Sequence, residues 1–320
     1  MSILDPNLYG KSTLQPSSKS ECMSVYLFGG HISKSLSPLI NMILFKSAGL
    51  PWTYGLCETT DPKRFQEVVG RLDCIGASVT MPNKVAFMPL LDDLTEEARC
   101  IGAVNTVFIR LDQEGRRRYI GTNTDCIGIR DTIMNNLPTL AQEKRSRPAL
   151  VIGAGGAARS AIYALWRWFG PSEIYLVNRL KSEIDDLVAG IQSTIPGIRL
   201  RHIVSLEDQV AASTPQIIVG TVPDGVPSDD GEITSWRICE AFIRGGSSKG
   251  AVLDMCYHPA RTRLLALAEA NGWSTMLGTE VLVRVNVAQQ RLWTEQDPDP
   301  KDLSELFLAI RQANEGDAKL

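Results

Sequence analysis

The sequence predicts an α/β protein of two domains, with a mixed sheet in the first domain and a doubly wound parallel sheet in the second. The 320 residues exceed what a single hydrophobic core usually sustains. Strand and helix patterns alternate along most of the chain. An apolar run over 148–152 enters a glycine-rich turn so late that a separate domain is expected before it.

The first domain is expected over 23–137, after a flexible N-terminal tail over 1–22. Ser37 is a candidate N-cap, with Pro38 at the first position of a helix that continues to residue 48. A second helix is expected over 61–72. Short apolar runs predict the strands of the sheet, at 25–28, 53–57, 75–79, 101–110 and 118–121.

The second domain is expected over 148–278, after a polar and basic boundary segment at 142–147. The long helical pattern at 279–295 comes too late for another strand–helix unit, so we expect it to pack back and complete the first domain. A C-terminal helix and tail are expected over 296–320, frayed from 316. Helical patterns separate the predicted strands of this domain, as in a parallel sheet, at 173–177, 198–204, 216–220 and 251–255.

The glycine-rich turn at 153–158 lies between a predicted strand and a predicted helix, the context that a dinucleotide-binding fingerprint requires. Gly153 permits the tight turn, and Gly155 lets the backbone approach a pyrophosphate. Ala158 is small enough for the helix to pack on the strand. The helix N-terminus would then hold the anion, which predicts a Rossmann-type domain.

The composition is that of an ordinary globular protein, with 44% hydrophobic and 22% charged residues. The net charge of -3 provides no basic footprint for nucleic acid. No run of 18 apolar residues occurs and residues 1–21 are polar, so we expect a cytoplasmic protein without a membrane segment. A small-molecule substrate is the expected partner, and both a monomer and a homodimer suit this architecture.

No metal site is expected. The seven cysteines are odd in number and include no C-x-x-C pair, so we interpret them as reduced thiols. The three histidines are scattered without metal-ligand spacing.

Four polar motifs of the first domain are candidates for chemistry, and each has an ordinary structural explanation. The serines of 33–38 can cap a helix or bind a polyol. Lys84, at the end of the motif 79–84, can be a solvated surface charge or a catalytic group. The clusters 102–106 and 121–125 can be turns with Asx hydrogen bonds or ligand sites.

In this order and spacing, the motifs S-x-S-P, V-T-x-P-x-K, G-A-V-N-T, N-T-D-x-x-G and G-A-G-G-A-A-R resemble the shikimate dehydrogenase family, including its quinate dehydrogenase branch. The resemblance covers about 25–293. The segment 254–265 is similar to the family's strand-end motif near the nicotinamide. A standalone chain of this kind most resembles the fungal catabolic quinate and shikimate enzymes.

The resemblance implies reversible hydride transfer between NAD(P) and a ring secondary alcohol. Lys84 and Asp125 would be the catalytic pair, because the hydroxyl proton needs a nearby acceptor as the hydride leaves. Asp125 would also orient Lys84 and favour its protonated form. The substrate would contact Ser35, Ser37, Ser78, Thr80, Asn105, Thr124, Tyr257 and Val285.

The resemblance also implies the residues that contact the cofactor. The second strand of the nucleotide domain ends without an acidic residue at its tip, which favours NADP slightly. NAD stays open, because Leu180 and Glu183 replace the threonine and second arginine usual in NADP members. The implied cofactor residues are Gly153, Ala154, Gly155, Gly156, Ala157, Asn178, Arg179, Lys181, Thr221, Val222, Pro223, Met255 and Gly278.

Three departures from the family pattern concern the substrate. Ser78 replaces a longer asparagine, and counting back from Trp293 places Val285, with Asn286 beside it, where a glutamine is usual. Glu280-Val281 replaces Gly-Met. Two polar contacts are lost, each on the order of 1 kcal/mol or more if buried, so the preferred ring is expected to be less hydroxylated than shikimate or a different one.

Three hypotheses follow. The first is a quinate or shikimate dehydrogenase, since the catalytic pair and the cofactor turn are intact. The second is a related oxidoreductase retuned to another cyclic hydroxy or keto substrate of specialised metabolism. The third is a non-catalytic metabolite sensor, which the presence of every catalytic residue disfavours.

Overall fold

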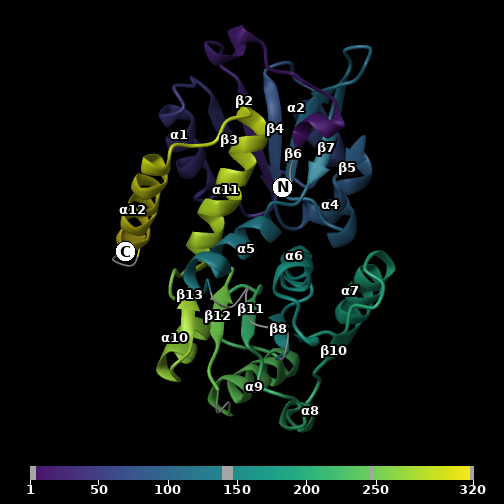
Figure 1. Ribbon diagram of the computed structural model, residues 1–320, viewed down its shortest axis with the longest axis vertical. Coiled ribbons are helices and arrows are strands. Elements are labelled where there is room, and N and C mark those ends of the chain that lie inside the picture. The colour runs from purple at the N-terminus through teal and green to yellow at the C-terminus, as the bar shows by residue number, and fades with distance from the viewer. Residues whose placement is uncertain (1–4, 139–146, 246–247, 318–320) are drawn as a thin grey trace. The chain divides into compact units, whose positions relative to one another are not determined.

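The computed structural model describes residues 5–138, 147–245 and 248–317. The chain divides into two compact units (Figure 1). Unit 1 comprises Met1–Thr124 with Val283–Leu320, and unit 2 comprises Asp125–Leu282. The expected boundary segment lies outside the described residues except for Arg147. None of the helices in the described ranges is long and apolar enough to cross a membrane.

Unit 1 is built on a seven-stranded mixed sheet with the order β3-β2-β4-β6-β7-β5, in which β1 also pairs with β6. Its strands are β1 (Lys11–Ser12), β2 (Ser24–Gly29), β3 (Thr53–Glu58), β4 (Cys74–Val79), β5 (Asp93–Leu94), β6 (Thr106–Leu111) and β7 (Arg117–Thr122). Its helices are α1 (Ser37–Ser47), α2 (Pro62–Val69), α3 (Asn83–Ala86), α4 (Glu96–Ile101) and α12 (Pro300–Asp317), with short 3₁₀ turns at Pro6–Tyr9, Pro16–Lys19 and Met88–Leu90. The helix α11 (Gly278–Thr294) belongs to unit 1 from Val283 onward.

The strand directions in unit 1 bring several chain segments to one edge of the sheet. β2 and β4 are parallel, whereas β6 is antiparallel to both β4 and β7. Thr106, at the start of β6, therefore pairs with Ser78 near the end of β4 and with Thr122 at the end of β7. The carboxyl ends of β2, β4 and β7 thus meet the amino end of β6, and all four predicted polar motifs adjoin this edge.

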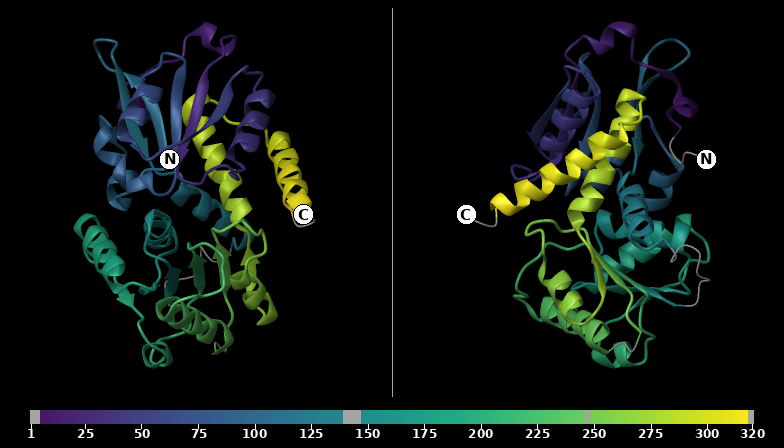
Figure 2. Two further views of the ribbon diagram at one scale, coloured as in Figure 1. Left: turned by 180° about the vertical axis from the view of Figure 1, so that it is seen from behind. Right: turned by 60° about the vertical axis from the view of Figure 1, so that its left-hand side comes forward.

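Helices cover both faces of the unit 1 sheet, as the views in Figure 2 show. α1 and α11 pack on the face that contains Val25 and Leu27, and α2 packs on the opposite face. α11 approaches the sheet closely at Gly76, where a Cβ atom would lie 2.2 Å from Nε1 of Trp293. Only glycine leaves room for this indole, and Nε1 of Trp293 donates to the carbonyl oxygen of Val107 at 3.0 Å.

The N-terminal residues make contacts with the sheet and with Trp52 that the sequence analysis did not predict. β1 pairs with β6, and Nε1 of Trp52 donates to the carbonyl oxygen of Ser18 at 2.8 Å. These contacts are with residues far along the chain, so a local polar pattern does not reveal them. Residues 1–4 lie outside the described ranges.

Unit 2 contains the predicted parallel sheet, with the order β10-β9-β8-β11-β12-β13. Its strands are β8 (Ala149–Ile152), β9 (Ile174–Val177), β10 (Leu200–His202), β11 (Ile217–Gly220), β12 (Ala251–Asp254) and β13 (Ser274–Met276). Its helices are α5 (Asp125–Asn136), α6 (Gly156–Ala164) continued by a π-helical turn at Leu165–Phe169, α7 (Lys181–Thr194), α8 (Leu206–Val210), α9 (Asp230–Gly245), α10 (Arg263–Ala270) and the start of α11.

The strand order of unit 2 indicates where its sheet is expected to bind a ligand. α9 and α10 pack on one face of the sheet through Phe242 and Leu265, and α5 and α6 lie side by side. β8 is the first strand and sits between β9 and β11, so the order reverses beside it. A doubly wound sheet binds its ligand at the carboxyl ends of the strands at such a reversal. The glycine turn after β8 lies at this position.

Candidate active site

The serine turn after β2 is the first part of the site in unit 1. α1 begins at Ser37, and Oγ of Ser35 accepts the backbone N–H of Ser37 at 3.2 Å. The predicted N-cap role of Ser37 is therefore wrong, because the side chain that binds the first turn comes from Ser35. The hydroxyl of Ser37 makes no hydrogen bond with the described residues and is available to a ligand.

Lys84 is held at the same edge by its backbone and its neighbours. Nδ2 of Asn83 donates to the carbonyl oxygen of Thr59 at 2.8 Å, and the carbonyl of Lys84 accepts the N–H of Val104 at 2.8 Å. Thr80 donates its backbone N–H to Phe28 at 2.8 Å. Lys84 is partly buried. The structure thus fixes Lys84 beside the strand ends, unlike a lysine on a freely solvated loop.

Asn105 is held by three hydrogen bonds to the oxygen of its side chain. Oδ1 accepts from the N–H of Thr124 at 2.8 Å, from its hydroxyl at 3.2 Å and from the hydroxyl of Thr106 at 2.7 Å. These three residues are buried. Because Oδ1 accepts all three of these bonds, the orientation of the Asn105 amide is set.

Asp125 follows Thr124 directly and is the first residue of α5. Its side chain is 6% exposed. A carboxylate in the first turn of a helix is stabilised there by the helix dipole. Its pairing with Lys84 stays a prediction.

Two residues that the sequence analysis missed, Tyr54 and Gln289, are bonded to these polar residues of unit 1. The hydroxyl of Ser78 accepts from the Tyr54 hydroxyl at 2.8 Å and donates to Oε1 of Gln289 at 3.1 Å. Nε2 of Gln289 donates to the hydroxyl of Thr106 at 2.9 Å. Gln289 lies one helical turn after Val285, and residues four apart share a helix face. That spacing was the available signal for Gln289.

Two other amides of α11 bond to α1. Oδ1 of Asn286 accepts from Asn41 of α1 at 2.6 Å, and Nε2 of Gln290 donates to the carbonyl oxygen of Leu44 at 3.1 Å. Val285 is buried and presents only methyl groups. Gln289, in contrast, bonds to Ser78, which is one of the predicted substrate residues, and to Thr106.

The glycine turn of unit 2 fits a dinucleotide. Gly153 has φ +115°, and a Cβ atom there would lie 2.5 Å from Oγ1 of Thr221. At Gly155, in contrast, a Cβ atom would meet nothing within 4 Å. Gly155 is also the N-cap of α6, and no side chain caps this helix end. Unpaired N–H groups beside open space are what a pyrophosphate requires.

The polar and basic residues that follow β9 are bonded to carboxylates that the sequence analysis did not predict as their partners. Nδ2 of Asn178 donates to Oε2 of Glu183 at 2.7 Å. Nη1 of Arg179 pairs with Glu232 at 2.8 Å, and Nζ of Lys181 pairs with Asp185 at 2.6 Å. The two predicted cations therefore already have carboxylate partners, although such exposed pairs are weak.

The remaining predicted cofactor residues also adjoin the carboxyl ends of strands. Thr221, Val222 and Pro223 follow β11, Met255 follows β12, and Gly278 begins α11. Their contact with a cofactor stays a prediction.

Asp254 fixes the strand-end turn that leads to Tyr257. Its Oδ2 accepts from the Thr262 hydroxyl at 2.7 Å, and its Oδ1 accepts the N–H of Cys256 at 3.1 Å. Burial raises the pKa of Asp254 to about 6. Tyr257 is partly buried in unit 2, with its ring 4.6 Å from that of His258. The structure therefore groups Tyr257 with the nucleotide turn, whereas the other predicted substrate residues belong to unit 1.

The comparisons with known proteins agree with this arrangement. A family model described as the shikimate dehydrogenase substrate binding domain matches residues 27–107. A quinate dehydrogenase from Emericella nidulans is 37% identical over 289 residues, which cover 85% of this chain and 88% of that protein. The chain belongs to the shikimate and quinate dehydrogenase family.

Solved structures of the family share the fold. A quinate dehydrogenase from Corynebacterium glutamicum in complex with NAD matches with a TM-score of 0.74 and 24% identity, over 90% of this chain and 99% of that one. A shikimate 5-dehydrogenase from Thermus thermophilus in complex with NADP(H) and shikimate matches with a TM-score of 0.68 and 29% identity, over 89% and 98%. The predicted family and fold class are confirmed, and these two solved structures hold NAD and NADP(H), respectively.

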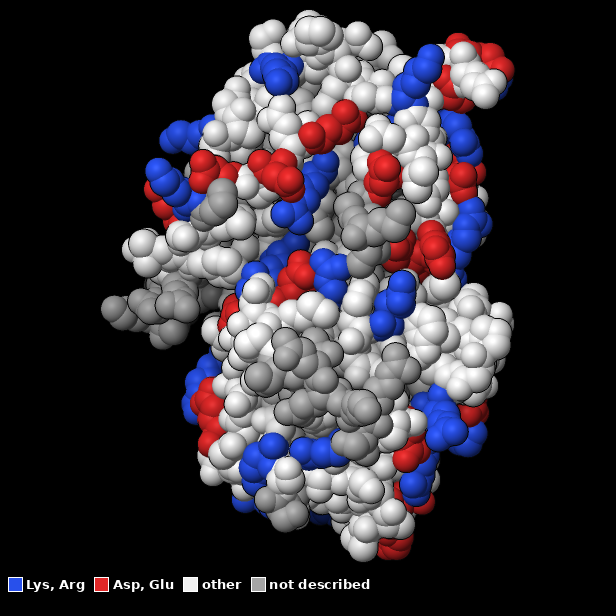
Figure 3. All heavy atoms as spheres, viewed as in Figure 1, with Lys and Arg blue, Asp and Glu red and all other residues white. Residues whose placement is uncertain are grey.

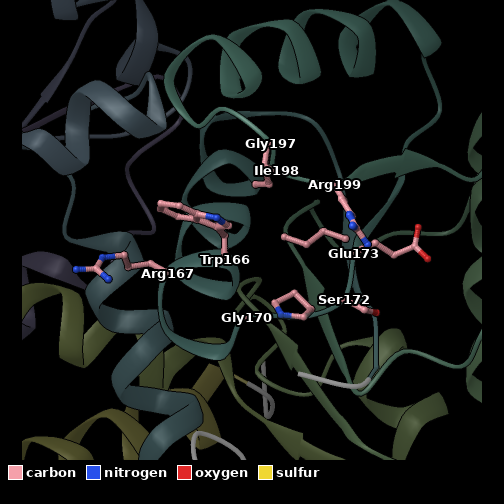
Figure 4. Close-up of a pocket in the computed structure, with 10 residues that line it drawn as sticks. Trp166, Arg167, Gly170, Ser172, Glu173, Gly197, Ile198 and Arg199 are labelled. Atoms are coloured by element: carbon pink, nitrogen blue, oxygen red, sulfur yellow. The ribbon is translucent and has the colours of Figure 1, made fainter. Parts of the chain in front are cut away.

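A cavity in unit 2 is separate from the dinucleotide crevice of this family. It has a volume of about 310 Å³ and is lined by Trp166, Gly170, Glu173 and Arg199, among others (Figure 4). Glu173 directly precedes β9, so the cavity lies at the amino end of that strand. The glycine turn follows the carboxyl end of β8, which is parallel to β9. The cavity is therefore not the nucleotide site.

The charged side chains on the face shown in Figure 3 are mixed in sign. Basic and acidic residues alternate there, without a broad basic patch among the coloured residues. This distribution suits a family that acts on small molecules, and groups of His, Cys, Asp and Glu able to hold a metal do not occur in the described parts of the chain.

Proposed function

We propose that this protein is an NAD(P)-dependent dehydrogenase that oxidises a ring secondary alcohol of a cyclic hydroxy acid, with quinate first and shikimate second as substrates. The observation that carries this proposal is the cluster of Ser78, Asn105 and Thr124 at one sheet edge, with the backbone of Lys84 bonded to the adjacent loop. The 37% identity to a quinate dehydrogenase supports the choice of quinate.

Lys84 and Asp125 provide the proton chemistry in this proposal. The bound nicotinamide supplies the hydride acceptor, and in the reverse direction the hydride donor. As the carbon–hydrogen bond breaks, the neutral amine of Lys84 accepts the hydroxyl proton and a carbonyl forms. In reduction, the ammonium of Lys84 polarises the carbonyl and returns the proton. Asp125 orients the amine and accepts a hydrogen bond from the substrate.

The remaining side chains hold the substrate. Asn105 contacts a ring oxygen in this proposal, with its side-chain amide oriented by the three donors to Oδ1. The hydroxyls of Ser35, Ser37 and Thr80 are suited to the carboxylate and the other ring hydroxyls. A site built from such polar groups rejects analogues that lack the matching hydroxyl, since its own donors would stay unpaired.

We expect NAD to be the preferred cofactor, against the slight preference for NADP predicted from the sequence. The carboxylate of Glu183 lies at the tip of β9, bonded to Asn178, where an acidic group accepts the ribose hydroxyls of NAD. Arg179, the candidate for a 2′-phosphate, pairs with Glu232. Glu183→Gln should therefore reduce the ratio of kcat/KM for NAD to that for NADP by roughly tenfold.

A control variant distinguishes the role of the Glu183 carboxylate from a general effect of removing a negative charge from α7. Asp185→Gln removes a carboxylate from the same helix, but that carboxylate is paired with Lys181. It should leave the cofactor ratio within about twofold of the wild type. An unchanged ratio in Glu183→Gln would show that this carboxylate does not contact the ribose.

The function is tested by following reduced nicotinamide at its absorbance band, with NAD and NADP each against quinate and shikimate. Turnover of either acid supports the proposal and identifies the cofactor. Binding of the nucleotide without turnover of either acid would favour an oxidoreductase for another cyclic hydroxy or keto compound. Binding of the acid without any turnover would favour a sensor. The cytoplasmic location and the choice between monomer and homodimer stay predictions.

A further inference from the structure

Gln289 belongs to a buried chain of hydrogen bonds in which each side chain donates to the next one. The hydroxyl of Tyr54 donates to Ser78, Ser78 donates to Gln289, and Gln289 donates to Thr106. Thr106 in turn donates to Oδ1 of Asn105. Nε2 of Gln289 uses its second proton on the carbonyl oxygen of Asn105 at 3.4 Å. Ser78 and Gln289 are each 3% exposed, so these bonds are shielded from water.

The direction of these bonds determines what Ser78 can offer a substrate. A serine hydroxyl has one proton, and Ser78 donates it to Oε1 of Gln289. Its oxygen accepts from Tyr54 and keeps one further lone pair. Ser78 is therefore an acceptor, and it matches a substrate hydroxyl that donates. The amide that the family usually carries at this position would offer a donor as well.

We propose that Gln289 is a positioning residue that makes Ser78 an acceptor and thereby selects the ring hydroxyl that the site binds. This inference rests on the proposed function. Gln289 acts through Ser78, and no contact between Gln289 and the substrate is needed. It also explains why a short serine is tolerated at this position, because the amide of Gln289 reaches Ser78 from α11.

The test compares two variants of the full-length protein with the same change on the same helix. Gln289→Leu frees the proton of Ser78, so the hydroxyl no longer presents a lone pair in a fixed direction. We expect KM for the acid to rise roughly tenfold, with kcat within about threefold and the KM for the nucleotide unchanged. Gln290→Leu also removes a buried amide, but one bonded to Leu44 of α1. It should lower the thermal stability similarly and leave KM unchanged.

A double-mutant cycle with Ser78→Ala shows whether Gln289 acts through Ser78. Once Ser78 is alanine, Gln289→Leu should raise KM by no more than about twofold further, so the two effects are strongly non-additive. The effects of Ser78→Ala and Gln290→Leu should multiply. A structural role of Gln289 alone would change stability without this pattern in KM.

Failure of this inference and failure of the proposed function are distinguishable. A wild-type protein that turns over neither quinate nor shikimate contradicts the proposed function. If the wild type is active and Gln289→Leu has the same KM as Gln290→Leu, the positioning role is overturned. Independent effects of Gln289→Leu and Ser78→Ala on KM would also overturn it.

Discussion

Lys84→Ala should lower kcat by roughly a hundredfold or more, because the hydroxyl proton then has no positioned acceptor. The KM for the nucleotide should stay unchanged, since the glycine turn belongs to unit 2 and Lys84 to unit 1. Steady-state rates with saturating cofactor, measured from reduced nicotinamide, check both expectations.

Two further variants make this result specific to proton transfer. Lys84→Arg keeps the charge, but a guanidinium does not give up a proton near neutral pH, so kcat should stay low. Lys63→Ala removes an exposed lysine from α2 of the same unit and should leave kcat unchanged. Full activity of Lys84→Ala would remove Lys84 from the mechanism.

Gly155→Val should weaken dinucleotide binding by roughly 10- to 100-fold while the fold stays intact. Nothing lies within 4 Å of a Cβ atom at this position, and the backbone is extended with φ -77°, so valine fits the free protein. Its methyl groups would occupy the space that the pyrophosphate needs. Titration of the nucleotide, followed by fluorescence or calorimetry, measures the loss.

The control for this change is Gly245→Val at the end of α9. It makes the same substitution in the same unit, again with no neighbour within 4 Å of the Cβ position. It should bind the dinucleotide like the wild type. Gly153 is not suitable for this test, because its φ of +115° and its contact with Thr221 would disturb the fold itself. Equal affinity in Gly155→Val and Gly245→Val would place the pyrophosphate elsewhere.

Most of the fold could be predicted from the sequence because its determinants are local. The strand at 149–152 and the helix that starts at Gly156 are joined by a turn in which Gly153, with φ +115°, is required by geometry. In contrast, the pairing of Lys11 and Ser12 with β6 depends on residues about 100 positions away. A polar pattern at the N-terminus gives no indication of such a pairing, which the sequence analysis therefore missed.

The sequence motifs identify candidate residues that are close together in the chain, but they do not reveal contacts between segments that are far apart in the sequence. Asn105 and Thr124 were identified from short motifs, and the structure joins them. Gln289 was missed because its importance depends on the shortness of Ser78 on a distant strand. The partner of Arg179 was missed for the same reason, since Glu232 comes from α9 and not from the strand end.

The close packing of Trp293 on Gly76 has a consequence for engineering the substrate pocket. The indole fits against the sheet only where position 76 lacks a side chain, so α11 can neither slide nor rotate without losing this fit. The helix register is thus locked one turn beyond Gln289. Residues 285 and 289 can therefore be exchanged together, as a two-position library, with each new side chain entering at a known place. Any homologue with a larger residue at position 76 should carry a smaller one at position 293.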